Sequence, residues 1–142
     1  AVGGVLPDAD VLLMAAAPAD YRPAEALGAK APRQGGALLL ALEPTEDVLL
    51  ATAGRRKQGA VIVGFALETG DATAKAREKL KRKQLDLVVA NDASEPGAGP
   101  EVTTNRVTLV SRDGEAALPL QSKDEVAEAI LERVAQLVAS RG

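Results

Sequence analysis

The sequence predicts an α/β fold of the Rossmann-like type, with a mostly parallel sheet flanked by helices and an antiparallel hairpin at its edge. Two observations lead to this prediction. Short apolar runs alternate with helical patterns along the chain, which is typical of parallel β-α-β units. Near the end, Asp113-Gly114 separates two strand-like runs, and Asp-Gly is a strong hairpin signal. With 142 residues, the chain suits one domain, residues 1–142.

Strands are predicted wherever a short apolar run is bounded by turn residues. The clearest buried run is AVIVGFA, and two further runs, DVLLMAA and LDLVVA, share its character. A fourth run, ALLLALE, is also a strand candidate, although Ala and Leu favour a helix too. In chain order, the predicted strands are 10–16, 37–43, 60–66, 85–90, 106–110 and 116–120.

Three helices are predicted, at 45–58, 71–84 and 122–140. In the first, Thr45 is the expected cap, with acidic residues in the first turn and basic residues in the last, as the helix dipole favours. The last is the best defined, because Ser122 and Glu125 form a capping box. It also carries one apolar stripe, made of Val126, Ile130, Val134 and Leu137.

Proline and glycine mark the loops between these elements. Pro18 and Pro23 prevent a continuous helix, so residues 17–34 are predicted to be mostly loop. Residues 30–36 at its tip combine glycines with exposed charges, as in a mobile flap. Residues 94–104 are a second loop, rich in proline and glycine.

Composition excludes several classes of function. The net charge is −3 with both signs mixed along the chain, which argues against nucleic-acid and membrane partners. No apolar run reaches the roughly 18 residues of a membrane span, so a cytoplasmic protein is expected. Cysteine and histidine are both absent, which excludes disulfides, thiolate catalysis and imidazole triads. Any metal must be oxygen-bound, and Mg²⁺ carried on phosphates fits best.

Polar side chains follow three predicted parallel strands at the point where each strand ends. Asp20 follows the first, Glu68 the central one and Asn91 the third, and Phe65 is the one large ring among small residues. Open parallel sheets bind ligands beyond the carboxyl ends of their strands. Taken singly, Asp20 and Asn91 are as readily explained as turn caps and Phe65 as core. Together the three exits favour a ligand site.

A basic stripe runs along the second predicted helix. Lys75, Lys79 and Lys83 are four residues apart and therefore share one helical face. Such a stripe is most often simply solvated, but it is also suited to phosphates. Its position after the strand that carries Phe65 favours the second interpretation.

Several segments in the same order resemble one family, phosphopantothenoylcysteine synthetase, which in bacteria is usually fused behind a flavin-dependent decarboxylase. The family's AAVADYRP, KIKK-type flap, PDIL and VGFAAET segments are followed by a lysine-bearing helix and a D-hydrophobic-AN segment. The corresponding segments here are AAPADYRP (16–23), KAPR (30–33), EDVL (46–49), VGFALET (63–69), Lys79 with Lys83, and DLVVAN (86–91). The resemblance covers about residues 10–132.

The resemblance implies an activity. The family joins 4′-phosphopantothenate to L-cysteine, using CTP to form an acyl-cytidylate with release of pyrophosphate; CMP then leaves when the cysteine amine attacks. Mg²⁺ accompanies CTP, and FMN enters only if a fused decarboxylase domain lies upstream. A homodimer is also implied, with residues 37–43 and 106–120 as candidate edges.

The resemblance also implies roles for individual residues. Lys30 on the flap would be catalytic, stabilising charge as the acyl-cytidylate forms. Ala16 and Asp20 would hold the cytidine with Phe65 beside it, and Lys79 and Lys83 would bind the triphosphate. Ala17 and Asn91 are expected on the substrate side. The nucleotide pocket would also be lined by Glu46, Asp47, Val48 and Leu49.

The sequence departs from the family pattern in a few places. Pro18 stands where the family has Val, Glu46 where it has Pro, and Pro32-Arg33 replaces the second half of KIKK. The family's opening strand and its S-N-x-x-S-S-G-K-M-G segment are not in this sequence. We therefore expect the C-terminal portion of the ligase domain, which binds CTP weakly and does not complete ligation alone.

Three alternatives stay open on sequence grounds. One is a non-catalytic nucleotide-binding α/β module without cytosine preference. Another is an NAD(P)-binding Rossmann domain, although no GxGxxG follows a strand. The third is a purely structural or interaction domain.

Overall fold

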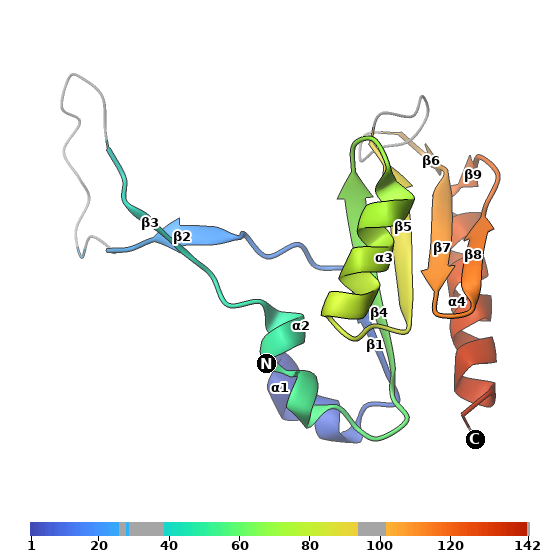
Figure 1. Cartoon of the computed structure of the whole chain (residues 1–142), viewed down its shortest axis with the longest axis horizontal. Coiled ribbons are helices and arrows are strands. Elements are labelled where there is room, and N and C mark those ends of the chain that lie inside the picture. Colours follow the sequence, from blue (N-terminus) through green and yellow to red (C-terminus); the bar gives the residue numbers. More distant parts are fainter. Residues whose placement is uncertain (26–27, 29–38, 94–101, 142) are drawn as a thin grey trace.

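The computed structural model describes residues 1–25, 28, 39–93 and 102–141. A five-stranded sheet in the order β1-β4-β5-β7-β8 forms its centre (Figure 1). The first three of these strands are parallel, and β7 and β8 complete the sheet in antiparallel fashion. The α/β prediction with a parallel core and an antiparallel edge hairpin is confirmed. The strands are β1 (Val11–Met14), β4 (Val61–Glu68), β5 (Leu87–Asp92), β7 (Val107–Ser111) and β8 (Gly114–Ala117).

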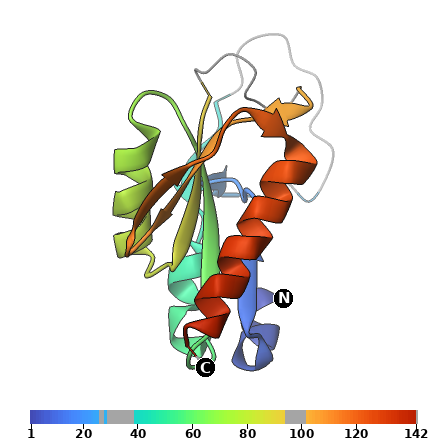
Figure 2. The ribbon, with the colours of Figure 1, turned by 90° about the vertical axis from the view of Figure 1, so that its right-hand side faces the viewer.

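One long helix covers each face of this sheet. Figure 2 shows the two helices on opposite sides of it, α3 (Ala72–Arg82) on one and α4 (Lys123–Ala139) on the other. Alternate residues of β4 point to the two faces, so that Ile62 packs on the α3 side and Val61 and Val63 on the α4 side. The predicted stripe of α4 is buried against the sheet.

Both long helices begin with the caps that their sequences suggest. Asp71 precedes α3, and its side chain accepts a hydrogen bond from the Ala74 N–H at 2.9 Å. Ser122 and Glu125 form the predicted capping box at the start of α4. These local signals fix where the helices start.

The helix predicted at residues 45–58 is wrong in length and in its cap. A single α-turn, α2 (Val48–Ala51), is followed by the 3₁₀ helix η2 (Ala53–Arg55). Asp47 caps α2, accepting hydrogen bonds from two backbone N–H groups. Thr45 is not the cap because α2 begins three residues later, and its hydroxyl instead donates to the Ala19 carbonyl.

Two short strands form an arm that leaves the body of the protein (Figure 1). β2 (Tyr21–Pro23) pairs in antiparallel fashion with β3 (Leu42–Pro44), and an ion pair joins Arg22 and Glu43 at 2.7 Å. β2 lies in a segment predicted to be mostly loop. β3 replaces the longer strand predicted at 37–43, of which residues 39–43 are described. The flap at 30–36 lies outside the described residues.

The remaining elements are short. α1 (Val2–Val5) and η1 (Leu6–Asp8) precede β1, and β6 (Thr104–Asn105) pairs with β9 (Gln121–Ser122) beside the start of α4. None of the helices in the described part of the chain is both long and apolar enough to span a membrane.

Gly64 in β4 is required by packing. A Cβ atom built on Gly64 would lie 2.7 Å from Cδ1 of Leu85, a fully buried side chain under α3. Leu85 would have to shift to relieve this contact, so the glycine of the VGF segment makes room for Leu85 in the core. This glycine therefore has a structural explanation independent of any ligand.

Candidate functional site

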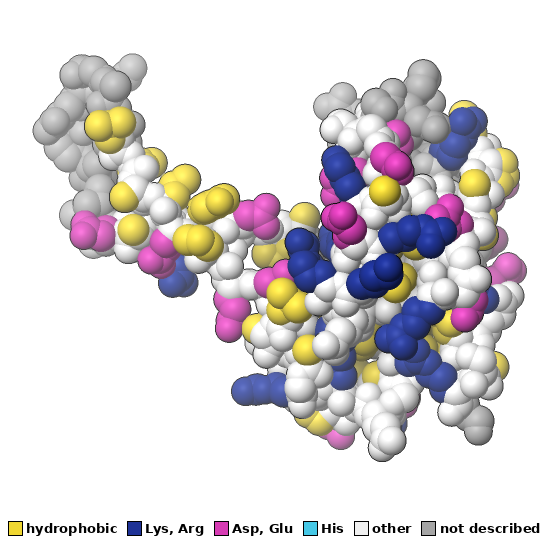
Figure 3. Space-filling view, viewed as in Figure 1, with side chains coloured by type: hydrophobic (Ala, Val, Ile, Leu, Met, Phe, Trp, Pro, Cys, Tyr) yellow, Lys and Arg dark blue, Asp and Glu magenta, His cyan; other side chains and the backbone are white. Residues whose placement is uncertain are grey.

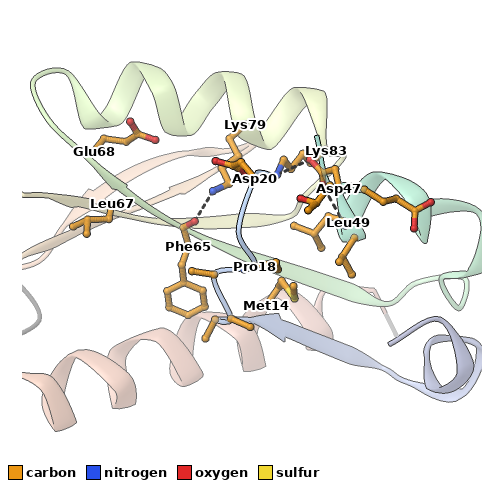
Figure 4. A pocket seen from close by; sticks show the side chains of 16 residues that line it. Met14, Pro18, Asp20, Asp47, Leu49, Phe65, Leu67, Glu68, Lys79 and Lys83 are labelled. Atoms are coloured by element: carbon orange, nitrogen blue, oxygen red, sulfur yellow. Dashed lines mark hydrogen bonds and ion pairs between the residues drawn. The ribbon is translucent and has the colours of Figure 1, made fainter. Parts of the chain in front are cut away.

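A pocket of about 500 Å³ lies at the carboxyl ends of β1 and β4, between these strands, α2 and α3 (Figure 4). This is the edge at which open parallel sheets bind ligands. Its walls come from four segments: the exit of β1, the segment that leads into α2, the end of β4 and the inner face of α3. The lining residues are Met14, Ala15, Ala16, Ala17, Pro18, Asp20, Thr45, Glu46, Asp47, Val48, Leu49, Phe65, Leu67, Glu68, Lys79 and Lys83.

The first wall is held together at the base of the arm. Beyond Met14 the chain continues with small residues, and then the Asp20 carbonyl accepts a hydrogen bond from the Thr45 N–H at 2.8 Å. The Thr45 hydroxyl adds the bond to Ala19 already described. Segments that are far apart in the sequence therefore meet here, which brings Asp20 and Glu46 to the same pocket.

The second wall contains an ion pair between Lys83 and Asp47. The Lys83 ammonium lies 2.8 Å from Oδ2 of Asp47, and the Lys83 side chain is only 15% exposed. Oδ1 of Asp47 accepts the N–H groups of Leu49 and Leu50 at 3.1 and 3.3 Å. Burial raises the pKa of Asp47, but the hydrogen bonds from Lys83 and Leu50 outweigh it and hold that pKa below its ordinary value. Asp47 is therefore a carboxylate that links α2 to α3.

Lys79 lies one turn earlier on α3 and has a different environment. Its ammonium donates a hydrogen bond of 2.6 Å to the main-chain carbonyl of Phe65, as the dashed line in Figure 4 marks. Burial, followed by the positive charge of Lys83, lowers the pKa of Lys79 below its ordinary value. A neutral carbonyl compensates the charge of an ammonium group less than a carboxylate does. Lys79 is therefore less neutralised by its partner than Lys83 is.

The Phe65 ring points away from Lys79, although both residues line the pocket (Figure 4). The ring packs against the apolar cluster on the α4 side of the sheet, whereas Lys79 reaches the carbonyl from the α3 side. The pocket therefore passes over the end of β4, with an apolar ring on one side and ammonium groups on the other.

Every residue predicted to bind the nucleotide lines this one pocket, and so does Ala17, which was predicted on the substrate side. The nucleotide residues are Ala16, Asp20, Glu46, Asp47, Val48, Leu49, Phe65, Lys79 and Lys83. Asn91 does not line it; the residue lies near the end of β5, and its buried Oδ1 has no hydrogen-bond partner among the described residues. Lys30 lies outside the described residues.

Several lining residues had no role assigned from the sequence, although signals existed for most of them. Glu68 was noted at the strand exit that predicted the site, Leu67 precedes it, and Pro18 follows the first strand. Thr45 was interpreted as a helix cap. Lys75, the third member of the basic stripe, does not line the pocket: its ammonium lies 3.2 Å from Glu68 and donates to the Thr69 carbonyl.

The family model that matches the chain is described as "DNA/pantothenate metabolism flavoprotein C-terminal domain" and covers residues 1–138. A Bacillus subtilis protein named coenzyme A biosynthesis bifunctional protein CoaBC is 40% identical over 143 residues, 100% of this chain and 35% of that protein. A protein of an unknown prokaryotic organism, named cysteine/cysteine sulfinic acid decarboxylase, is 38% identical over 92% of this chain and 37% of its own length. The chain thus spans little more than a third of these relatives.

Solved structures agree with this relationship. The crystal structure of the C-terminal domain of a CoaBC protein has a TM-score of 0.74 and 32% identity, over 98% of this chain and 60% of that one. The Streptococcus pneumoniae DNA/pantothenate metabolism flavoprotein shares the fold, with a TM-score of 0.76 at 22% identity over 94% of this chain and 66% of that one. The chain therefore belongs to the family of DNA/pantothenate metabolism flavoprotein C-terminal domains.

Proposed function

We propose that the pocket binds CTP and that the chain belongs to a ligase that joins 4′-phosphopantothenate to L-cysteine in coenzyme A biosynthesis. The observation that carries this proposal is the convergence of Lys79, Lys83 and Asp20 on one pocket at the strand exits. The family and its CoaBC relatives support the assignment. The fused flavin-dependent decarboxylase implied by the resemblance would hold FMN in another part of such a protein.

The reaction consists of a displacement at phosphorus followed by acyl transfer. A carboxylate oxygen of 4′-phosphopantothenate attacks the α-phosphorus of CTP, and the bond to the leaving pyrophosphate breaks. The cysteine amine then attacks the acyl carbon of the acyl-cytidylate, CMP leaves, and the nitrogen loses a proton to solvent as the amide forms. Both steps depend on alignment and charge neutralisation, which suits a chain without histidine or cysteine.

We assign the triphosphate to Lys79 and Lys83. Lys83 is already held in place by Asp47, and Lys79 needs only to exchange a carbonyl for a phosphate oxygen. Within the described residues, no three acidic side chains are grouped as a metal site. Mg²⁺ would therefore be bound through the phosphates, where it would add positive charge.

We assign the cytidine to the opposite wall. Ala16 and Ala17 are small enough to let a ligand approach the backbone, and Asp20 offers a carboxylate acceptor beside them. Phe65 would lie beside the nucleotide, and the segment from Glu46 to Leu49 would complete the pocket. Ala17 would also face the second substrate.

We propose that Asn91 binds the pantothenate portion of that substrate. Within the part of the chain that the structure describes, its buried Oδ1 has no partner, and an orphaned buried acceptor is costly unless something supplies a donor. Its neighbour across the sheet is Leu67, which lines the pocket. Lys30 retains its proposed role in stabilising the acyl-cytidylate step.

We also propose that the arm pairs with a second copy of the chain. Two-stranded hairpins are marginal by themselves, and this one exposes apolar side chains (Figure 3). Leu39 is 95% exposed and Leu42 is 56% exposed. Analytical ultracentrifugation should give a dimer for the chain and a monomer for Leu42→Lys; a wild-type monomer would contradict this.

Nucleotide selectivity tests the proposed function. Titration of the chain with CTP, ATP and GTP in the presence of Mg²⁺ should show CTP binding at least about tenfold more tightly, or ~1.4 kcal/mol. Equal affinities would favour a non-catalytic nucleotide-binding module. Binding of NAD(P)H instead would favour a Rossmann oxidoreductase, and no nucleotide binding would favour a structural domain.

A further inference from the structure

The Arg56 guanidinium joins three carbonyl groups at the back of the pocket. Its Nη1 donates to the Gln84 carbonyl at 2.7 Å, and its Nη2 donates to the carbonyls of Leu49 and Lys83 at 2.8 and 3.1 Å. Leu49 belongs to α2, whereas Lys83 and Gln84 follow the end of α3. A single side chain therefore connects α2 to the end of α3, and both helices contribute residues to the pocket.

The carbonyls at the end of α3 need such a donor. The last carbonyls of a helix lack partners within the helix, and a cation there also interacts favourably with the helix dipole. Gln84 has a φ of 51°, a left-handed conformation that ends the helix and turns the chain towards β5. Arg56 therefore both satisfies and locates the final turn of α3.

Burial of Arg56 is costly, which argues against an incidental contact. Desolvation lowers the pKa of the guanidinium below its ordinary value, partly offset by the charge of Asp86. Its Nε is buried and has no hydrogen-bond partner in residues 1–25, 28, 39–93 and 102–141. The Nε group of Arg56 thus loses its hydration, while the two terminal nitrogens donate to the three carbonyls.

Two of these carbonyls belong to residues that line the pocket, Leu49 and Lys83. The Lys83 ammonium faces Asp47, which precedes α2. α2 is one turn of four residues, too short to be stable by itself. We propose that Arg56 is a positioning residue of the nucleotide pocket: it fixes the ends of α2 and α3 and thereby holds the Lys83 ammonium at the phosphate position.

This inference rests on the proposed function, since it assumes that Lys83 meets the phosphates. A double-mutant cycle of Arg56→Met and Lys83→Met tests it, with CTP dissociation constants measured by calorimetry on the chain. Arg56→Met should weaken CTP binding by roughly tenfold, within the range of coupled neighbouring residues. In the Lys83→Met background the same change should alter affinity by less than about twofold, because the ammonium that it positions is gone.

The neighbouring Arg55→Met is the matched control. Arg55 has the same charge, but it donates to the Gly3 carbonyl at 3.5 Å and does not line the pocket. It should leave CTP affinity unchanged. If Arg56→Met does not fold, Arg56→Lys keeps the charge but cannot reach three carbonyls at once, and it should also bind CTP several-fold more weakly.

The outcomes separate this inference from the proposed function. If Lys83→Met binds CTP like the wild type, the proposed phosphate site is wrong and the role of Arg56 falls with it. If Lys83→Met weakens binding but folded Arg56 variants bind normally, only the inference about Arg56 is overturned. The inference would also be overturned if Arg56→Met weakened CTP binding by the same factor with and without Lys83. Arg56 would then act on affinity independently of the Lys83 ammonium.

Discussion

The two ends of the central sheet use buried charge differently. At the amino ends of the strands, Asp86 has a side chain only 7% exposed, and Oδ2 accepts the Ile62 N–H at 2.8 Å while Arg141 donates to Oδ1. Arg141 also donates to the Ala60 carbonyl at 2.5 Å. At the carboxyl ends, Lys79 has a carbonyl as its partner and Lys83 a single carboxylate.

This difference separates charges that stabilise the fold from charges available to a ligand. Asp86 is bound by both an N–H group and a guanidinium, so its contacts are complete within the protein. Lys79 is partly desolvated and lacks an opposite charge at hydrogen-bond distance among the interactions described for it. A phosphate would supply that charge. Substitutions at the first end should therefore change stability, and those at the second should change binding.

Removing Asp86 should have the largest effect. Asp86→Ala leaves Arg141 without its carboxylate and the Ile62 N–H without its acceptor, which should lower the free energy of unfolding by about 3 kcal/mol. Urea denaturation measures this loss. Asp113→Ala is the control, because Asp113 is 81% exposed and lies 3.7 Å from Arg133, so its removal should have little effect. Equal losses in the two variants would refute the contrast.

Removing the Lys79 charge should mainly affect binding. Lys79→Met should weaken CTP binding by about 2 kcal/mol, the value of a charge-assisted hydrogen bond, while the free energy of unfolding stays the same or rises. Lys81→Met is the control, since Lys81 is exposed and lies on the same helix outside the pocket. Calorimetry and urea denaturation on both variants check this. A loss of stability without a loss of affinity would reverse the assignment.

Gly64 tests whether a residue next to the pocket can be purely structural. Gly64→Ala should destabilise the protein by about 1–2 kcal/mol, because the new methyl group overpacks against Leu85. If Leu85→Ala is added, the space it vacates should make Gly64→Ala less costly than in the wild type. Thermal denaturation of the four proteins measures this coupling, and additive losses would contradict the packing explanation.

The pH dependence of Lys79 should give the smallest effect. Its lowered pKa means that the unfolded chain binds more protons in the interval below the ordinary lysine pKa of about 10.4. In that interval the contribution of Lys79 to stability rises with pH, whereas CTP affinity falls as the ammonium loses its proton. Lys79→Arg keeps its positive charge at alkaline pH, so its CTP affinity should fall less with rising pH than that of the wild type. Calorimetric titration between neutral and alkaline pH checks it; identical profiles would contradict the prediction.

Much of the fold could be predicted because its signals are local. The apolar run of β4, the capping box of α4 and the Asp113-Gly114 turn each depend on neighbouring residues. The pocket could be located because parallel strands place their carboxyl ends at one edge of the sheet. Its residues could be proposed from the family resemblance.

The errors come from contacts between distant residues. Thr45 is the cap that the sequence predicts, but its hydroxyl donates to the carbonyl of Ala19, 26 residues away, and Asp47 caps the shorter helix instead. The pairing that forms the arm likewise joins residues far apart in the chain. The position of Arg56 depends on carbonyls up to 28 residues away, and no local pattern indicates it.

The central claim is that CTP binds at the carboxyl end of the sheet, and amide chemical shifts measured by NMR during titration with CTP and Mg²⁺ test it most directly. The claim predicts that the shifted amides cluster around Ala16, Asp47 and Phe65, whereas those around Asp86 and Ala60 stay in place. A second basic hollow, lined by Arg77, Lys81 and Arg112 among others, lies between α3 and the β7–β8 hairpin. Shifts confined to that hollow would contradict the claim.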